Sequence, residues 1–279
     1  MAANPDKIWL HGGYDERDVC RTTSSSWYDS GDTNDQEGLP INNYHGFARH
    51  DFQFGQHMAT IVVPHRPLAE KRWIWRTEFL GAFDTADVAM LHAGYYLVHY
   101  AIPDLYGCPQ AVRLMKDFYD LLVAERQFEQ KTTLFGFSRG GLYAVNFAVE
   151  YPDAICALYL DAPVLDIKSW PGGLGEGQGA PKEFAECLEH YGLDEQTVLH
   201  FSGNPIDRVH ELIEASIPVI VVAGDSDQVV PHTENCQRLI EAYAEHNGNF
   251  KYILKPGCGH HPHSLEDPAE IVDFLLGCR

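Results

Sequence analysis

Apolar and polar residues along this chain fall into blocks that predict strands and helices in turn. Two apolar runs within 46–64 indicate successive strands, the second of them buried. Beyond them, short apolar runs alternate with segments whose apolar residues recur at helical spacing. We expect further strands at 95–101, 132–137, 154–160, 217–223 and 250–254, and helices at 78–92, 110–128, 139–150, 233–246 and 268–276. This alternation predicts an α/β fold with a mostly parallel central sheet flanked by helices.

One segment, 163–213, interrupts the alternation between two predicted strands. It opens with a glycine-rich stretch at 170–179 and contains one helical segment at 183–190. The glycines lack the preceding strand and the Lys-Ser/Thr pair of a Walker loop, so a phosphate site is not indicated. We interpret the segment as a small cap or lid inserted where substrate enters, with Trp170 as a candidate substrate contact.

The N-terminal residues 1–45 have the composition of an irregular arm. They are rich in Asp, Ser, Thr, Asn and Gly, with one short strand expected near 7–10. The first ten residues contain no basic start followed by an apolar run, so no signal peptide is expected. We expect one domain over 1–279, comprising this arm, the sheet and the cap.

Charge and cysteine content narrow the classes of partner. The formal net charge is −20, which disfavours nucleic acid and anionic membrane surfaces as partners. No stretch approaches the 18 apolar residues of a membrane span. The seven cysteines are scattered and form no C-x-x-C pair, which fits free thiols in a reducing cytoplasm.

The strongest chemical signal is a G-x-S-x-G motif at 136–140. An apolar strand leads into it and an amphipathic helix leads out, which is the setting of a nucleophile elbow. Gly136 and Gly140 leave room for a tight turn that projects the Ser138 hydroxyl. The helix begins at Arg139, so the Arg139 N–H is a candidate oxyanion donor. The alternative is a glycine-rich turn with a solvated serine.

Acid and base candidates follow in the order that a catalytic triad requires. Asp225 and Asp227 lie in the turn after 217–223, and three histidines follow the last strand. His260 follows a glycine that frees the loop, whereas His261 precedes a proline that favours extended backbone. We expect His263 at the surface or in a supporting role. A His-x-x-His metal site lacks a carboxylate or cysteine at ligand spacing, so we expect no metal and no cofactor.

In these motifs the chain resembles the α/β-hydrolase superfamily over roughly 46–276. The motifs that carry the resemblance are 136–141, 224–231 and 259–268. The last is similar to the G-H-x-P-H-x-x-x-x-P ending of many esterases. The usual G-x-x-D-x-x-V-P pattern of the fold favours Asp227 over Asp225 as the acid of the triad. Within the superfamily, the chain looks most like bacterial prolyl-oligopeptidase-like proteins or carbohydrate-ester esterases.

The resemblance also implies a second oxyanion donor on the loop after the third strand. Many members have an H-G-G motif there, but the His-Gly-Gly at 11–13 lies far upstream of that strand. We expect the donor on the loop 65–77, from the backbone N–H of Trp75 or Arg76.

The same loop concentrates cations in an acidic protein. Together with Arg139, Arg76 suggests a substrate that carries a carboxylate or several hydroxyls, with Trp73 as a further candidate contact. The alternative is ion pairing with local acids such as Glu78 and Asp84.

These observations favour a serine hydrolase, resembling a carboxylesterase, that cleaves a small-molecule carboxylic ester through an acyl-enzyme. Ser138 is the expected nucleophile, His260 the base and Asp227 the acid that orients it. A peptidase, an acyltransferase or a C–C hydrolase would use the same triad, and a non-catalytic binding protein could use the same scaffold. The oligomeric state is left open by the sequence.

Overall fold

A computed structural model describes residues 42–246 and 248–278. These residues belong to one structural unit, Pro40–Arg279. The predicted strand near 7–10, the His-Gly-Gly at 11–13 and nearly all of the predicted arm lie outside the described residues.

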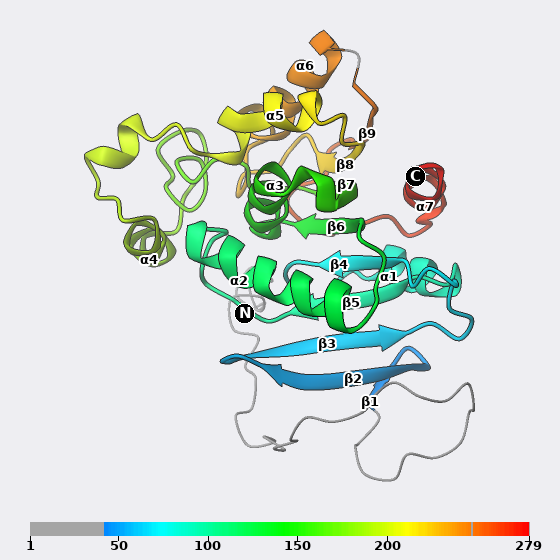
Figure 1. Ribbon diagram of the computed structural model, residues 1–279. Coiled ribbons are helices and arrows are strands. Elements are labelled where there is room, and N and C mark those ends of the chain that lie inside the picture. The colour runs from blue at the N-terminus through cyan, green and yellow to red at the C-terminus, as the bar shows by residue number, and fades with distance from the viewer. Residues whose placement is uncertain (1–41, 247, 279) are drawn as a thin grey trace, which may run out of the picture. The chain divides into compact units, whose positions relative to one another are not determined.

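A single sheet of nine strands organises the described chain (Figure 1). Its order is β1-β2-β3-β5-β4-β6-β7-β8-β9. The strands are β1 (Asn42–Tyr44), β2 (Phe47–Phe54), β3 (His57–Val63), β4 (Trp73–Arg76), β5 (Tyr96–Tyr100), β6 (Thr132–Phe137), β7 (Ile155–Asp161), β8 (Val219–Gly224) and β9 (Phe250–Lys255). The first three strands and β5 pair in antiparallel fashion, and from β5 to β9 every pairing is parallel. The predicted mostly parallel sheet is therefore confirmed.

Helices cover both faces of this sheet (Figure 1). They are α1 (Thr85–His92), α2 (Pro109–Asp120), α3 (Gly140–Glu150), α4 (Pro181–Tyr191), α5 (Val209–Glu214), α6 (Cys236–His246) and α7 (Ala269–Gly277). A π-helical turn, Leu121–Glu125, continues α2, and 3-10 turns lie at Pro152–Ala154, Thr197–His200, Pro205–Arg208 and His232–Glu234. Apolar side chains of α2, α3, α5 and α6 pack on one face of the sheet, and those of α1 and α7 pack on the other. Burial on both faces explains why the central strands have nearly continuous apolar sequences.

Strand β4 was not predicted, because its residues were assigned to a loop at 65–77. All four of its residues are buried, and Trp73 and Trp75 face the opposite core from Ile74. Arg76 made the segment look polar, but its guanidinium is neutralised inside the protein by Asp87. The predicted helix at 78–92 is correspondingly wrong at its start, since 77–84 is a turn and α1 begins at Thr85.

The chain between β7 and β8 contains the predicted helical segment, as α4. In Figure 1, α4 lies on the side to which the arrowhead of β6 points. Cys187 and Leu188 of α4 are buried in a small apolar cluster that also holds Trp170. Tyr191 at the end of α4 donates a hydrogen bond to the Tyr106 carbonyl at 2.8 Å. These contacts fix α4 to the body of the fold, and its role as a cap stays a prediction.

Two further expectations concern membranes and thiols. Within 42–246 and 248–278, no helix is long and apolar enough to cross a bilayer. The described cysteines, which exclude Cys20, are all free thiols.

Candidate active site

Ser138 occupies a tight turn between β6 and α3. Its φ of +49° places a non-glycine residue in the left-handed region, which costs conformational energy unless the surroundings hold it. The Ser138 N–H donates to the Asp161 carbonyl at 2.9 Å, and the Ser138 carbonyl accepts from Gly141 and Val164. A Cβ at Gly136 would meet the Ala144 Cβ at 2.9 Å, so the motif needs glycine there. The turn therefore has the strained geometry expected of a nucleophile elbow, and neighbouring backbone holds it in place.

A continuous chain of hydrogen bonds joins Ser138, His260 and Asp227. The Ser138 Oγ lies 2.9 Å from the His260 Nε2, and the His260 Nδ1 lies 2.7 Å from the Asp227 Oδ2. Because the carboxylate can only accept, the His260 Nδ1 carries the proton and its Nε2 can accept the serine proton. The other carboxylate oxygen accepts N–H bonds from Val229 and Val230, both at 2.9 Å. The structure thus brings together three residues from three different strand ends.

The first turn of α3 points toward the nucleophile. The side chain of Arg139 contacts acids, and its backbone N–H donates no hydrogen bond within the described residues. That N–H is next to Ser138 at the positive end of α3, where it can bind an oxyanion.

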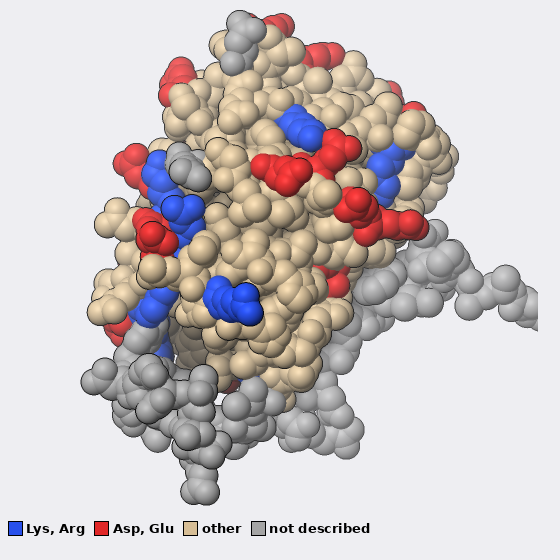
Figure 2. Space-filling model, turned by 90° about the vertical axis from the view of Figure 1, so that its right-hand side faces the viewer, with Lys and Arg blue, Asp and Glu red and all other residues tan. Residues whose placement is uncertain are grey.

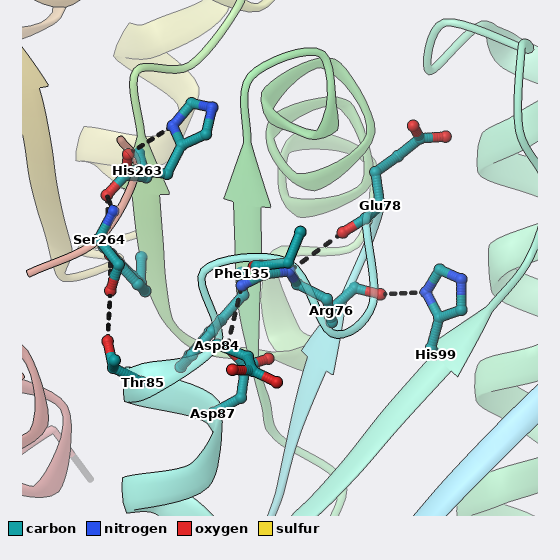
Figure 3. A network of polar contacts seen from close by, with 12 residues as sticks. Arg76, Glu78, Asp84, Thr85, Asp87, His99, Phe135, His263 and Ser264 are labelled. Atoms are coloured by element: carbon teal, nitrogen blue, oxygen red, sulfur yellow. Dashed lines mark hydrogen bonds and ion pairs between the residues drawn. The ribbon is translucent and has the colours of Figure 1, made fainter. Parts of the chain in front are cut away.

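The turn that follows β4 is held from inside by Arg76 (Figure 3). The Arg76 guanidinium is fully buried, pairs with Asp87 at 3.0 Å and donates to the carbonyls of Glu78 and Ala82. It also lies 3.5 Å from the ring centre of Phe137, the residue before the nucleophile. Arg76 therefore ties the turn at 77–84 to the base of the nucleophile elbow.

This geometry corrects three predictions about the loop 65–77. Trp75 and Arg76 are within a strand that pairs on both sides, with β5 and β6, so the predicted oxyanion donor, the N–H of Trp75 or Arg76, is wrong. Trp73 and Arg76 are 1% and 0% exposed, and both are committed to internal contacts, so neither is a substrate contact in this structure.

Trp170 is mostly buried, with its ring 6.3 Å from that of Tyr106, and its suggested contact with substrate stays a prediction.

An ion cluster lies directly beside the nucleophile. Arg139 pairs with the buried Glu78 at 2.6 Å and with the exposed Asp104 at 2.7 Å. Burial raises the pKa of Glu78, while the Arg139 charge acts in the opposite direction. Because both carboxylates pair with its guanidinium, Arg139 has no unpaired charge for a substrate carboxylate. The carboxylate-bearing substrate suggested by Arg139 is therefore not supported.

A second aspartate–histidine pair lies beneath the first. The His263 Nδ1 donates to the Asp161 Oδ1 at 2.7 Å, and the other Asp161 oxygen accepts from the Ser264 N–H and the Tyr159 hydroxyl. Burial lowers the pKa of His263, so its ring is neutral at pH 7. His263 is thus buried, which excludes the surface alternative and leaves the supporting one.

Sequence patterns did not indicate Asp104 or Asp161, and Glu78 was named only as an alternative ion-pair partner of the cations, a pairing that its contact with Arg139 confirms. Asp161 had a usable signal, because a polar residue at the carboxyl end of a buried parallel strand faces the edge where sites form. Glu78 and Asp104 lie in turns, where an acid is ordinary, and nothing local marks them.

Comparison with known proteins supports the fold. No protein-family model matches the sequence. Two uncharacterized proteins from strains of Mycobacterium tuberculosis are each 29% identical over 149 residues, which cover 50% of this chain and 42% of theirs.

Solved structures are similar over more of the chain. A puromycin-hydrolyzing peptidase of Mycobacterium tuberculosis superposes with a TM-score of 0.63 at 14% identity, covering 85% of this chain and 39% of that one. A puromycin hydrolase gives 0.60 at 19% identity, covering 82% and 37%. Dipeptidyl peptidase 4 of Porphyromonas gingivalis gives 0.60 at 13% identity, covering 85% and 36%. The described chain has the α/β-hydrolase fold, and the whole chain spans less than half the length of these relatives.

Proposed function

We propose that the protein is a serine hydrolase that cleaves an amide or peptide bond. The observation that carries the proposal is the hydrogen-bonded chain from Ser138 through His260 to Asp227. An accidental serine–histidine contact would not require a strained serine backbone, a buried carboxylate on the far ring nitrogen and a helix N-terminus next to the hydroxyl. All three features support a working nucleophile.

In the proposed reaction the Ser138 Oγ attacks the carbonyl carbon while the His260 Nε2 takes its proton. Asp227 holds the ring tautomer and stabilises the imidazolium that forms. The oxyanion is bound by the Arg139 N–H and by an N–H from the turn after β4. Thr77 is excluded as that second donor because its N–H is bonded to the Phe135 carbonyl, and the next residues of the turn, Glu78 and Phe79, are our candidates. His260 then protonates the leaving amine, and water repeats the sequence to release the acid.

The neighbouring structures favour an amide over the ester expected from the sequence. They are described as a puromycin-hydrolyzing peptidase, a puromycin hydrolase and a dipeptidyl peptidase. The acidic cluster of Glu78 and Asp104 beside Ser138 also suits a substrate with a free amine. A carboxylic ester is the alternative, since the same triad cleaves both bonds.

Two substrate series and one matched variant test this proposal. Aminoacyl p-nitroanilides and p-nitrophenyl esters are given to the wild type, Ser138→Ala and Ser202→Ala, an exposed serine outside the site. We expect anilide hydrolysis that disappears in Ser138→Ala and persists in Ser202→Ala, with fluorophosphonate labelling of Ser138. Ester cleavage alone would support the alternative substrate. Activity that survives in Ser138→Ala would refute the assigned nucleophile.

A further inference from the structure

We propose that His260, His261 and His263 form a binding site for a divalent transition metal of the zinc class, and that metal bound there inhibits the enzyme. All three residues lie in the loop after β9. His260 and His261 are adjacent, and one proline, at 262, separates them from His263. The metal site rests on geometry alone, whereas its inhibitory effect rests on the proposed function.

The three imidazoles converge on one point from different directions. One ligand atom from each ring lies within 4.8 Å of the other two. The ring centres are 4.9 Å apart for His260 and His261, 4.9 Å for His260 and His263, and 4.8 Å for His261 and His263. The ring planes cross at 66°, 82° and 90°, so none of the three rings stacks on another.

These separations match a tetrahedral site. Zinc binds imidazole nitrogen at about 2.0–2.1 Å, which places the centres of two ligating rings about 5 Å apart at tetrahedral angles. The ligand atoms lie within 4.8 Å of one another and would have to approach to about 3.4 Å, so metal binding would require the side chains to rotate toward a common centre. A fourth position would remain for water, as in zinc sites with three histidines.

His263 is already oriented as metal-binding histidines are. Its Nδ1 is bonded to the buried Asp161, which leaves the Nε2 as its free ligand atom. A carboxylate on the far nitrogen is the usual support for a histidine ligand. The sequence argument against metal missed it, because Asp161 comes from β7, far along the chain.

His261 would give a metal access to the site from solvent, and His260 would link metal binding to loss of activity. His261 is exposed, and its ring stacks on Phe83 with centres 5.6 Å apart. The His260 Nε2 accepts from Ser138 in the metal-free arrangement, so a metal on that nitrogen would displace the serine hydroxyl. A bound metal would thereby remove the general base from the nucleophile.

Zinc titration of the full chain as the Ser138→Ala variant, without a histidine tag, tests the site apart from catalysis. The variant keeps all three histidines and removes the competing hydroxyl. By isothermal calorimetry we expect one zinc per chain, with at least about tenfold weaker binding in Ser138→Ala/His261→Ala and in Ser138→Ala/His263→Ala. Ser138→Ala/His210→Ala, which removes an exposed histidine of α5, should bind as Ser138→Ala does. Tetrahedral cobalt absorption provides a second readout of the same site.

The outcomes separate this inference from the proposed function. The metal site is overturned if Ser138→Ala binds no zinc. It is also overturned if Ser138→Ala/His261→Ala binds zinc as tightly as the control Ser138→Ala/His210→Ala. In the wild type, zinc should slow hydrolysis and a chelator should restore it, and zinc should slow His261→Ala less, relative to the metal-free rate of that variant. Zinc bound at His261 in a chain that hydrolyses nothing would support the site while refuting the hydrolase.

Discussion

Two aspartates, two positions apart in the turn after β8, have different environments. The Asp227 Oδ2 accepts from the His260 ring at 2.7 Å, and its side chain is almost fully buried. Asp225 is exposed and accepts from the Gly257 N–H at 2.7 Å. The bond from the Gly257 N–H and, to a smaller extent, one from the Ser226 hydroxyl lower the pKa of Asp225. Asp225 therefore anchors the histidine loop through its backbone, and Asp227 holds the His260 ring.

The pair gives a matched test of the triad. Asp227→Asn should lower kcat about 10³- to 10⁴-fold, because an amide stabilises the wrong His260 tautomer and cannot stabilise the imidazolium. Asp225→Asn should lower kcat less than about tenfold, since its amide oxygen can still accept from Gly257. Steady-state kinetics on both variants decide the assignment. Equal losses would contradict it.

His99 makes stability depend on pH. Burial lowers the pKa of His99 to about 4, because a charged ring would lose its water, and its neutral ring donates to the Arg76 carbonyl at 2.8 Å. In the unfolded chain His99 titrates near its ordinary value of about 6.5. Between these two values the unfolded state holds more protons, so the free energy of unfolding falls as pH is lowered.

We expect His99 to lower the free energy of unfolding by at most about 3 kcal/mol between pH 7 and pH 4. His99→Asn, which keeps a donor without the titration, should reduce the difference between urea unfolding at these two values. His210→Asn, on the surface, should leave the difference unchanged. A wild-type difference that is unchanged in His99→Asn would contradict the prediction.

At the scale of elements, the turn after β4 depends on one buried ion pair. Arg76→Ala would leave the buried Asp87 without its partner, and it would release the carbonyls of Glu78 and Ala82. We expect a loss of about 3–5 kcal/mol in the free energy of unfolding. Lys116→Ala, which breaks the exposed pair with Asp120 on α2, should cost less than about 1 kcal/mol. Urea titration compares the two, and similar losses would show that the Arg76 pair contributes little.

The elements that the sequence predicted are those with long periodic patterns. Strand β6 was predicted at its observed bounds, and β5, β7, β8 and β9 were placed within about two residues. Strand β4 was not predicted, because a run of four residues that contains an arginine does not have the sequence pattern of a buried strand. Only the fold supplies Asp87 from α1 to neutralise that charge.

The candidate site divides in the same way. The serine, aspartate and histidine lie at ends of strands that the sequence marks, so their order and spacing were readable. The positions of the turn at 77–84 and of the Asp161–His263 pair depend on which strands are neighbours in space. The β5-β4-β6 order is not encoded in any local pattern.

For the whole molecule, the charge balance bears on the substrate. The formal net charge is −20, and Figure 2 shows acidic and basic groups interspersed on the visible face, where no broad basic area appears. Beside Ser138, the two carboxylates of Glu78 and Asp104 surround the single guanidinium of Arg139, which leaves an excess of one negative charge if both are ionised. A cationic substrate should therefore be drawn to the site, and salt should screen that attraction.

N-acetyl-lysine and N-acetyl-norleucine p-nitroanilides provide the comparison, since their side chains have similar length and differ in charge. We expect kcat/KM for the lysine substrate to fall severalfold, up to about tenfold, as ionic strength rises from low to about 0.5 M. The norleucine substrate should change little. Asp104→Asn should reduce the salt dependence for lysine, and identical salt responses of the two substrates would contradict electrostatic attraction.

Asp161 joins two parts of the site that are far apart in the chain. Its carbonyl accepts from the Ser138 N–H, and its carboxylate accepts from the Ser264 N–H and the His263 ring. The serine turn and the histidine loop therefore share one anchor and should open as one cooperative unit. In hydrogen–deuterium exchange, the amides of Ser138 and Ser264 should lose protection with the same free energy of opening. The protein would then lose the proposed nucleophile and the proposed base together, in a single local unfolding event.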